Sequence, residues 1–383
     1  MTTYETFDSM ELNDNLLRGI YSHGFEKPSN IQQKSINILR SGKDLIAQSQ
    51  SGTGKTGAFV IGSLSKIDVN NKNVQIIILS PTRELAIQIH NVANSISQYM
   101  NIKNTLLIGG NFINMNNIRN ELKDTQMIIG TPGKIYDLIN RGILKIDKLE
   151  SIVLDEADEI LSKDFKEQFF EILKFINNKI QIVLYSATMS KDIMDVVENI
   201  LDEPEKILVT KEELTLEGIR QFYINVVQDR YKLDALIDIY SSLSINQTII
   251  YINTINRALQ LQNKLRYQGL ESSLLHSKIT QVERNNVLND FRNGKSRILL
   301  STDIISRGID IQSVSIIINY DVPNYKETYI HRIGRSGRYG RKGIAINFVT
   351  RKEQNILNYI RRMYNTDIHP FPEDVNSVLS AFK

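Results

Sequence analysis

The stretch SQSGTGKT at residues 49–56 decides the fold of this chain. It follows a short run at residues 44–47 that predicts a strand, and it precedes residues 57–64, which predict the start of a helix. A strand, a glycine-rich loop ending in Lys-Thr and a helix form the arrangement that cradles nucleotide phosphates. The alternative is an ordinary glycine-rich turn, and Ser49 stands where the general motif has glycine.

The chemistry of this loop follows from its residue types. Glycines let backbone N–H groups turn toward an anion, and the N-terminal end of a helix adds partial positive charge. Lys55 is expected to reach the β- and γ-phosphates, and the Thr56 hydroxyl is expected to bind Mg²⁺. The sequence therefore predicts a site for a nucleoside triphosphate.

The composition is that of a globular protein with two domains. The chain has 383 residues, of which 41% are hydrophobic and 23% are charged. We predict no membrane span and no secretory signal, and hence a cytoplasmic protein, with the nucleus as the alternative. The absence of cysteine excludes disulfides, and the 5 histidines lack zinc-ligand spacing. Because the net charge is only +3, nucleic-acid binding would depend on locally placed basic groups and backbone amides.

Continuous apolar runs in the first half predict buried parallel strands flanked by helices. The predicted strands are 44–47, 74–80, 105–109, 126–130, 151–155, 181–186 and 206–209. Several end in polar or glycine-rich clusters, namely Pro81 to Glu84, Gly109-Gly110, Thr131 to Lys134, Asp155 to Asp158, and Ser186 to Thr188. Each cluster alone could be an ordinary turn. Because ligands bind at the carboxyl ends of strands in open parallel sheets, the series predicts one continuous binding edge.

The acidic pair after the predicted strand 151–155 has a catalytic interpretation. A carboxylate at the end of a buried strand can hold Mg²⁺, and a second one beside it can orient or deprotonate an attacking water. We assign the first role to Asp155 and the second to Glu156. Strand-end acids also cap helices, so the assignment depends on the GKT loop about a hundred residues upstream.

The alternation of strands and helices pauses at polar, charged residues near 202–218. We predict an N-terminal domain over 1–209, a linker at 210–218 and a C-terminal domain over 219–383. The second domain has predicted strands at 219–227, 247–252, 272–275, 296–301, 314–319 and 343–349. It contains no second GKT loop, so we do not expect it to hold nucleotide alone.

A basic segment in the second half suggests how both domains could contribute to one site. Arg332, Arg335 and Arg338 recur every three residues, which on a helix would place them along one face. A solvated basic stripe is the alternative, but Gly334 and Gly337 are poor choices for such a helix and permit close approach of another surface. An arginine presented this way can stabilise charge on a transferring phosphoryl group.

These motifs resemble those of the DEAD-box RNA helicases, over nearly the whole chain and in the order of that family. The matching segments are GFEKPSNIQQ at 24–33, SQSGTGKT, PTREL, GG, TPGK, DEAD, SAT, QVER at 281–284, STDIISRGID at 301–310 and YIHRIGRSGR at 329–338. The resemblance implies two RecA-like domains, an RNA-stimulated ATPase that unwinds short RNA duplexes by domain closure, and a role in translation initiation.

The resemblance also implies a role for individual residues. Phe25 would stack on adenine and Gln32, which can also pair with adenine on chemical grounds, would read its edge. The cofactor ATP would be held by Phe25, Lys27, Gln32, Ser51, Gly52, Thr53, Gly54, Lys55, Thr56, Asp310, Arg335 and Arg338. Catalysis would use Glu156, Lys55, Asp155, Arg335 and Arg338, with Thr56 and Asp155 on Mg²⁺. Asp158, Ser186 and Thr188 would couple ATP state to RNA, which would lie on Thr82, Arg83, Gly109, Gly110, Thr131, Gly133, Lys134 and Thr302.

The chain departs from the family pattern at four positions. Lys134 replaces an arginine, which keeps the charge but loses the bidentate fork for phosphate. Ile255 and Asn256 replace a basic pair, and Ser277 replaces a glycine. We expect these departures to affect RNA affinity or second-domain contacts rather than ATP chemistry.

The expected partners are RNA, bound through its backbone with little sequence preference, and a scaffold protein that grips both domains of a monomer. A different hypothesis is an ATP-gated RNA clamp that serves as an assembly platform and releases RNA slowly. A DNA translocase is a further alternative, which comparison of RNA with DNA as ATPase stimulator would test.

Overall fold

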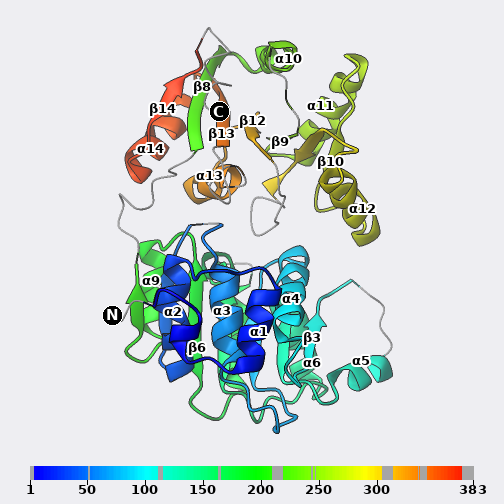
Figure 1. Cartoon of the computed structure of the whole chain (residues 1–383). Helices are drawn as coiled ribbons and strands as arrows, with labels where there is room; N and C mark the ends of the chain where they lie inside the picture. Colours follow the sequence, from blue (N-terminus) through cyan, green and yellow to red (C-terminus); the bar gives the residue numbers. More distant parts are fainter. Residues whose placement is uncertain are drawn as a thin grey trace. The chain divides into compact units, whose positions relative to one another are not determined.

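The computed structural model describes residues 4–50, 52–110, 115–162, 165–208, 219–242, 245, 247–303, 314–334, 336 and 343–372. The chain divides into two units, Met1–Val209 and Thr210–Lys383. Each unit is built on one sheet with helices against its faces (Figure 1). The two units are described separately below.

The first sheet has seven strands, and every recorded pairing between them is parallel. Its strands are β1 (Leu45–Gln48), β2 (Ile76–Leu79), β3 (Asn104–Leu107), β4 (Met127–Gly130), β5 (Ser151–Asp155), β6 (Gln181–Ser186) and β7 (Glu205–Ile207), in the spatial order β3-β4-β2-β5-β6-β1-β7. The register pairs Ile76 with both Met127 and Ser151, so β2 lies between β4 and β5.

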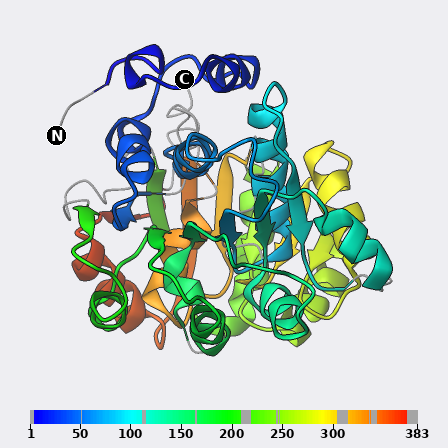
Figure 2. The same ribbon diagram turned by 90° about the horizontal axis from the view of Figure 1, so that it is seen from below.

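Both faces of this sheet are covered, which explains why its strands are continuously apolar. Side chains alternate along each strand, so Ile76 and Ile78 enter one core whereas Ile77 and Leu79 enter the other. The first core is closed by η1 (Asp8–Met10), α1 (Asp14–Ser22), α2 (Asn30–Ser41), α3 (Lys55–Leu64) and α4 (Arg83–Ser97). The second is closed by α5 (Met115–Leu122), α6 (Pro132–Asn140), α7 (Ala157–Ile160), α8 (Lys166–Lys174) and α9 (Lys191–Glu198) (Figure 2).

Helix α1 packs closely across α4. A Cβ atom added at Gly19 would clash with the backbone carbonyl of Ile96, so glycine permits this approach. Beside it, the Arg18 guanidinium lies 4.0 Å from the centre of the Tyr99 ring. The N-terminal helix is therefore attached to α4 by backbone proximity as well as by side chains.

The second sheet repeats the parallel design. Its strands are β8 (Ile219–Val227), β9 (Thr248–Tyr251), β10 (Ser273–Leu275), β11 (Ile298–Ser301), β12 (Ile316–Asn319), β13 (Gly343–Thr350) and β14 (Ile368–Pro370), in the order β10-β11-β9-β12-β13-β8-β14. Helices α10 (Lys232–Ser242) and α11 (Ile255–Tyr267) close one core, and α12 (Gln281–Arg292), α13 (Lys326–Ile333) and α14 (Gln354–Tyr364) close the other face. The short helix η2 (Asp229–Tyr231) precedes α10.

The predicted α/β class with two parallel sheets is confirmed. Every predicted strand forms, with ends shifted by a residue or two. Strand β14 was not predicted, because three residues ending in Pro370 carry no strand pattern and are held only by pairing with β8. The predicted linker at 210–218 lies outside the described residues. None of the described helices is both long and apolar enough to cross a membrane.

The contact between α1 and α4 generates a stability prediction. Gly19→Ala should lower the free energy of unfolding by about 1–3 kcal/mol, because the added methyl group meets backbone that cannot rotate away. Gly133→Ala is the control, since its Cβ would meet no atom within 4 Å; it should leave stability unchanged or raise it by about 0.5–1 kcal/mol. Urea unfolding measures both changes, and equal behaviour of the two variants would contradict the prediction.

Candidate active site

The loop between β1 and α3 has the backbone form that its glycines predict. Gly52 and Gly54 adopt φ values of +83° and +97°, a left-handed conformation that glycine enters without strain. Helix α3 then begins at Lys55, whose buried ammonium donates to the Ser49 carbonyl oxygen at 2.9 Å. Thr56 follows, half-buried, in the first turn of α3. The lysine side chain thus folds back over the loop that it closes.

Other polar groups of the loop bond to each other or to β6. The Thr53 hydroxyl donates to the Gln50 carbonyl oxygen at 2.8 Å. The Ser49 N–H donates to the Ser186 carbonyl oxygen at 3.0 Å, which attaches the loop to β6, the neighbour of β1 in the sheet. Ser51 lies outside the described residues. The described part of the loop is held in a defined shape by these bonds.

The segment at residues 25–32 lies directly against this loop, as the nucleotide hypothesis requires. Gln32 accepts a hydrogen bond from the Ser29 N–H at 2.8 Å and donates to the Gly54 carbonyl oxygen at 3.1 Å. A Cβ atom at Gly57 would lie 2.6 Å from the Gln32 amide nitrogen and 2.9 Å from the Phe25 ring. Glycine at position 57 therefore makes room for both side chains beside the first turn of α3. Lys27 is exposed nearby in sequence.

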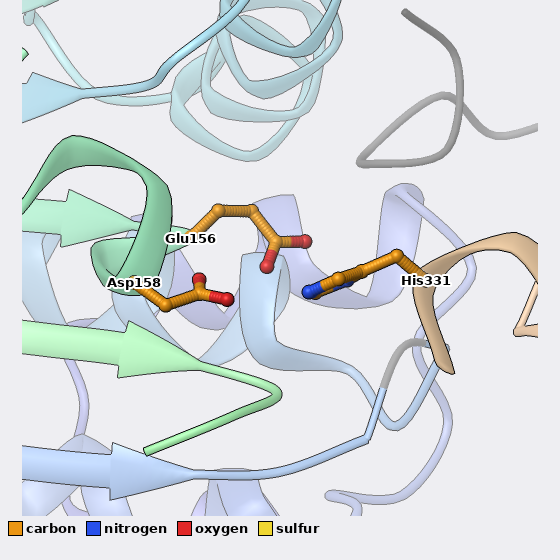
Figure 3. Close-up of side chains that lie close together, drawn as sticks. All are labelled: Glu156, Asp158 and His331. Atoms are coloured by element: carbon orange, nitrogen blue, oxygen red, sulfur yellow. The ribbon is translucent and has the colours of Figure 1, made fainter. Parts of the chain in front are cut away.

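Two acidic side chains, Asp155 and Glu156, stand at the end of β5; Figure 3 shows Glu156 together with Asp158, the next acid along the chain. Asp155 and Glu156 are both buried, and Asp155 accepts a hydrogen bond from the Glu156 N–H at 3.1 Å. Glu156 adopts a left-handed φ of +53°, which is uncommon for a residue with a side chain and turns the chain sharply between β5 and α7. Burial and the neighbouring Glu156 raise the pKa of Asp155 to about 7, while Lys55 opposes that rise.

A divalent cation fits this pair on chemical grounds. Two buried carboxylates beside one lysine leave an excess of negative charge when both ionise. Ionising the second carboxylate is therefore unfavourable, and the pKa of Asp155 is raised. Oxygen ligands are those that Mg²⁺ prefers, and the Thr56 hydroxyl on α3 adds another. The residues present are therefore a suitable donor set for Mg²⁺.

The third acid, Asp158, connects β5 to β6. The Thr188 hydroxyl donates to an Asp158 carboxylate oxygen at 2.6 Å, and Ser186 donates to the Thr188 carbonyl oxygen at 2.7 Å. All three side chains are buried. The two strand ends are thus joined by a polar contact that any movement of either loop would disturb.

The order of the strands sorts the predicted residues into two groups. Strands β5, β6 and β1 are neighbours and carry the acidic, Ser-Ala-Thr and phosphate-loop clusters. Strands β3, β4 and β2 are also neighbours and carry the Gly109-Gly110, Thr131 to Lys134 and Thr82-Arg83 clusters. Because all of these strands are parallel, both groups stand at one edge of the sheet, and they meet where β2 pairs with β5.

The second group contains an arginine at a helix start with two glycines beside it. The Thr82 hydroxyl caps α4 by accepting from the Leu85 N–H at 3.3 Å, and Arg83 starts that helix. A Cβ atom at Gly109 would lie 3.2 Å from the Arg83 guanidinium, and one at Gly110 would clash with it. Glycines at these positions therefore leave space for the arginine.

Helix α6 begins beside this position with Thr131 as its N-cap. Among the described residues, no heavy atom outside its own helix turn lies within 4 Å of the Cβ position of Gly133, so the first turn of α6 is open there. Lys134 lies 4.0 Å from Asp137 on the same helix. Free N–H groups at a helix N-terminus attract phosphate, and α4 and α6 both start at this sheet edge.

In the second unit, Arg332 is the only one of the three predicted arginines that lies within the described residues. Helix α13 ends at Ile333, with Gly334 as its C-cap, and Arg335, Arg338 and Asp310 lie outside the described residues. The Arg332 side chain is fully buried, with 0% exposure. Thr302 follows β11 and is half-buried, and its N–H donates to the Leu275 carbonyl oxygen at 3.3 Å.

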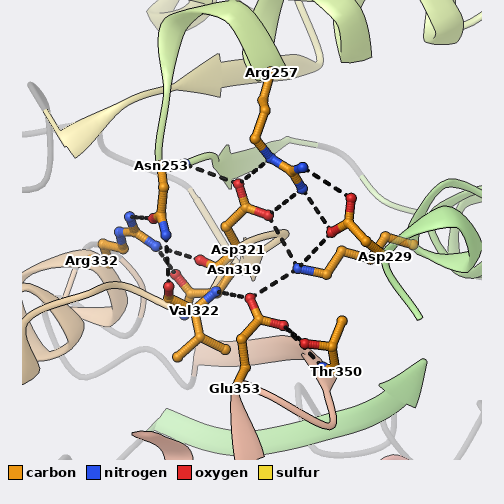
Figure 4. Close-up of polar contacts among 10 residues, drawn as sticks. Asp229, Asn253, Arg257, Asn319, Asp321, Val322, Arg332, Thr350 and Glu353 are labelled. Atoms are coloured by element: carbon orange, nitrogen blue, oxygen red, sulfur yellow. Dashed lines mark hydrogen bonds and ion pairs between the residues drawn. The ribbon is translucent and has the colours of Figure 1, made fainter. Parts of the chain in front are cut away.

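Arg332 is instead the centre of an internal hydrogen-bond network (Figure 4). Its guanidinium donates to Asp303 at 2.6 and 3.1 Å, to the Asn253 side chain at 2.8 Å and to the Asp321 carbonyl oxygen at 2.7 Å. The planar guanidinium presents several N–H donors in fixed directions, so one side chain can bond to groups at the ends of several strands. Arg332 therefore anchors the C-terminal end of α13 to the sheet.

The network continues to charges that the sequence analysis did not single out. Lys232 is 1% exposed and lies 3.1 Å from Asp321 and 3.0 Å from Glu353. Arg257 pairs with Asp321 at 2.7 Å and with Asp229 at 2.8 Å. Burial alone would raise the pKa of Asp321, but Arg257 and Lys232 outweigh it and hold that pKa below its ordinary value. No local pattern could have revealed this cluster, because its members are far apart in the sequence.

The buried cluster generates the second prediction. Lys232→Met should lower the free energy of unfolding of the second unit by up to roughly 3–5 kcal/mol, because it removes one of the two cations beside the buried Asp321 carboxylate and the cation beside Glu353. The folded pKa of Asp321 is depressed, so this stabilisation is present above the unfolded pKa and is lost as pH falls. The variant should therefore lose less stability than the parent when the pH falls from 6 to 3.

Lys43→Met is the matched control for this prediction. Lys43 pairs with Glu205 at 2.8 Å, but both side chains are exposed, so water replaces the lost partner. Urea unfolding at each pH measures both variants. A Lys232→Met protein as stable as the control would show that the cluster contributes little.

Comparison with known proteins follows the same division of the chain. Residues 29–196 match the DEAD/DEAH box helicase family, and residues 231–340 match the helicase conserved C-terminal domain. The "ATP-dependent RNA helicase eIF4A" of Debaryomyces hansenii is 47% identical, over 98% of this chain and 94% of that one.

Two solved structures extend the comparison to the fold. Saccharomyces cerevisiae Dbp5 bound to RNA and ADP BeF3 is 34% identical with a TM-score of 0.93, covering 99% of this chain and 100% of that one. A Dbp5 variant bound to Gle1 and IP6 has the same 34% identity and a TM-score of 0.81, with 100% of both chains covered.

Proposed function

The chain belongs to the DEAD-box family of ATP-dependent RNA helicases, and we propose that it separates short RNA duplexes locally, in translation initiation. Its two parallel α/β units are the RecA-like domains of that family, and its activity is RNA-dependent ATP hydrolysis. The proposal rests mainly on the order of the strands. The polar clusters that follow β5, β6 and β1 form a nucleotide group, and those that follow β3, β4 and β2 form a second group suited to an anion, at the same edge of the sheet.

ATP would be bound by residues that converge on the start of α3. Phe25 would stack on the adenine and Gln32 would read its edge, with Lys27 nearby. The phosphates would lie on the loop of Ser51, Gly52, Thr53, Gly54, Lys55 and Thr56, whose N–H groups suit an anion. Thr56 and Asp155 would hold Mg²⁺, which when bound offsets the negative charge of the phosphates.

Glu156 is the residue best placed to handle the attacking water. It directly follows Asp155, the proposed metal ligand, and its carboxylate is buried at the end of β5, where it can act as a general base. Water would attack the γ-phosphorus, Glu156 would take the proton, and the bond to the ADP oxygen would break. Arg335 and Arg338 would stabilise charge on the transferring group, and Asp310 would contact the ribose.

RNA would bind along the second group of strand ends. The open first turn of α6, the start of α4 and the Arg83 guanidinium suit backbone phosphates. The residues that would contact RNA are Thr82, Arg83, Gly109, Gly110, Thr131, Gly133 and Lys134, with Thr302 contributing from the second domain. The hydrogen bond from Thr188 to Asp158 joins the ends of β5 and β6 within the nucleotide group, and β5 pairs with β2 of the second group. This arrangement supports a coupling role for Asp158, Ser186 and Thr188. ATP and RNA together would bring the two domains to one composite site.

Contacts to the RNA backbone carry no direct sequence information, so a partner would have to select the RNA. The related Dbp5 has been solved with Gle1 bound, which supports a scaffold protein that grips this chain as well. We propose a cytoplasmic monomer whose RNA target is chosen by that scaffold.

ATPase measurements with and without RNA test the proposed function. Single-stranded RNA should raise the ATP turnover number well above the basal value, whereas DNA of the same sequence should have little effect. Glu156→Gln should bind ATP with unchanged affinity but turn over about 10²–10⁴-fold more slowly, because the water loses its base. ATPase activity that RNA leaves unchanged would refute the coupling, and undiminished turnover in Glu156→Gln would remove it as the base.

The departure at position 134 generates a separate prediction. Lys134→Arg should lower the RNA concentration for half-maximal ATPase stimulation by about two- to fivefold, because a guanidinium can make two parallel bonds to a phosphate. Lys134→Gln should raise that concentration, and neither variant should change the KM for ATP at saturating RNA. If all three proteins need the same RNA concentration, Lys134 does not contact RNA.

A further inference from the structure

The ring proposed to stack on the base is contacted by an aromatic side chain outside the family motifs. The His23 ring meets Phe25 edge-on, with ring centres 4.8 Å apart and planes at 73°. Phe7 stacks against Phe25 at 6.5 Å with planes at 26°. Gly57 of α3 leaves room for the ring from the nucleotide side. Phe25 is therefore enclosed by defined neighbours and is itself only half-buried.

His23 is fixed in its turn to a different helix. Its Nδ1 atom lies 2.8 Å from the Ser95 hydroxyl on α4, and its N–H donates to the Gly19 carbonyl oxygen at 2.9 Å as α1 ends. At Gly19, α1 approaches α4 so closely that a Cβ atom would clash with the Ile96 backbone. The backbone of His23 is thus bonded to the last turn of α1, and its ring is bonded to α4.

The chemistry of the histidine suits a packing role. Burial lowers the pKa of His23, so the ring is neutral at neutral pH and brings no charge against Phe25. Edge-to-face contact is a favoured geometry for two aromatic rings, because the positive edge of one meets the negative face of the other. A ring already held in place loses less rotational freedom when a base stacks on it.

We propose that His23 is a positioning residue for nucleotide binding, which holds the Phe25 ring in the orientation that stacks on the base. This inference rests on the proposed function, because it assumes that Phe25 contacts the base of ATP. His23 itself touches neither the base nor the phosphates. Its contribution belongs to the affinity for ATP rather than to the hydrolysis step.

A set of single variants of the full chain tests the proposal. His23→Ala removes both the edge contact and the bond to Ser95, and His23→Phe restores the edge contact alone. Ser22→Ala is the matched control, because Ser22 precedes His23 and bonds to Tyr99 instead, at 3.3 Å. Phe25→Ala reports on the base-stacking assumption itself. Steady-state ATPase assays at saturating RNA give kcat and KM for ATP, and thermal unfolding verifies that each variant folds.

The expected result is a separation of KM from kcat. His23→Ala should raise the KM for ATP by about 2- to 10-fold, the range expected for losing one aromatic edge contact, with kcat within about twofold of the parent. His23→Phe should recover most of this loss, and Ser22→Ala should match the parent. If His23→Ala does not fold, Ser95→Ala provides the second test, with a smaller rise in KM and the same unchanged kcat.

Other outcomes would overturn the inference in distinguishable ways. An unchanged KM in His23→Ala together with a raised KM in Phe25→Ala would refute the role of His23 and leave the nucleotide site as proposed. Equal rises in His23→Ala and Ser22→Ala would point to general loosening of α1. An unchanged KM in Phe25→Ala would refute base stacking, which belongs to the proposed function, and the role of His23 with it.

Discussion

Parallel pairing is the constraint on which the rest of this structure depends. When every strand runs in the same direction, each carboxyl end reaches the same edge of the sheet, and each strand must be followed by a helix that returns the chain. The turns that leave the edge can then carry chemistry without disturbing the core. The phosphate loop, the acidic pair and the Thr-capped starts of α4 and α6 all occupy such turns. One backbone rule therefore brings together residues that are more than a hundred positions apart.

Several close contacts in the first domain depend on glycine, which has no side chain to block them. Gly19 lets α1 approach α4, Gly57 admits Phe25 and Gln32 beside the phosphate loop, and Gly110 leaves space for Arg83. These glycines create contact between elements rather than flexibility within them. The contacts beside the phosphate loop and around Arg83 both depend on such close approaches, so a single added methyl group would displace a side chain without removing it.

The two domains handle buried charge differently. Around Asp155 the carboxylates outnumber the nearby lysine, and the raised pKa of Asp155 records an environment suited to an added cation. Around Asp321 the cations Lys232 and Arg257 keep the pKa low, and Arg332 ties the same region to α13. The first arrangement is suited to ligand binding, whereas the second is complete in itself and stabilises the domain. Both groups of charges are buried, so burial alone does not distinguish a ligand-binding site from a charge cluster that only stabilises the fold.

The sequence by itself determined the fold class, the strands and the residue types at the strand ends, because continuous apolar runs and glycine-lysine loops have few structural solutions. It could not place Arg332, whose spacing with Arg335 and Arg338 predicted a helix face presented to another surface. The Arg332 side chain is instead buried, and it donates to Asp303 and to the Asp321 carbonyl oxygen. It also gave no sign that Lys232 would be buried or that His23 would meet Phe25, since these contacts join separate elements. The local pattern of apolar residues predicts whether each segment forms a helix or a strand. Only tertiary packing decides which segments meet, because that depends on the order of the strands and on how closely their helices can approach.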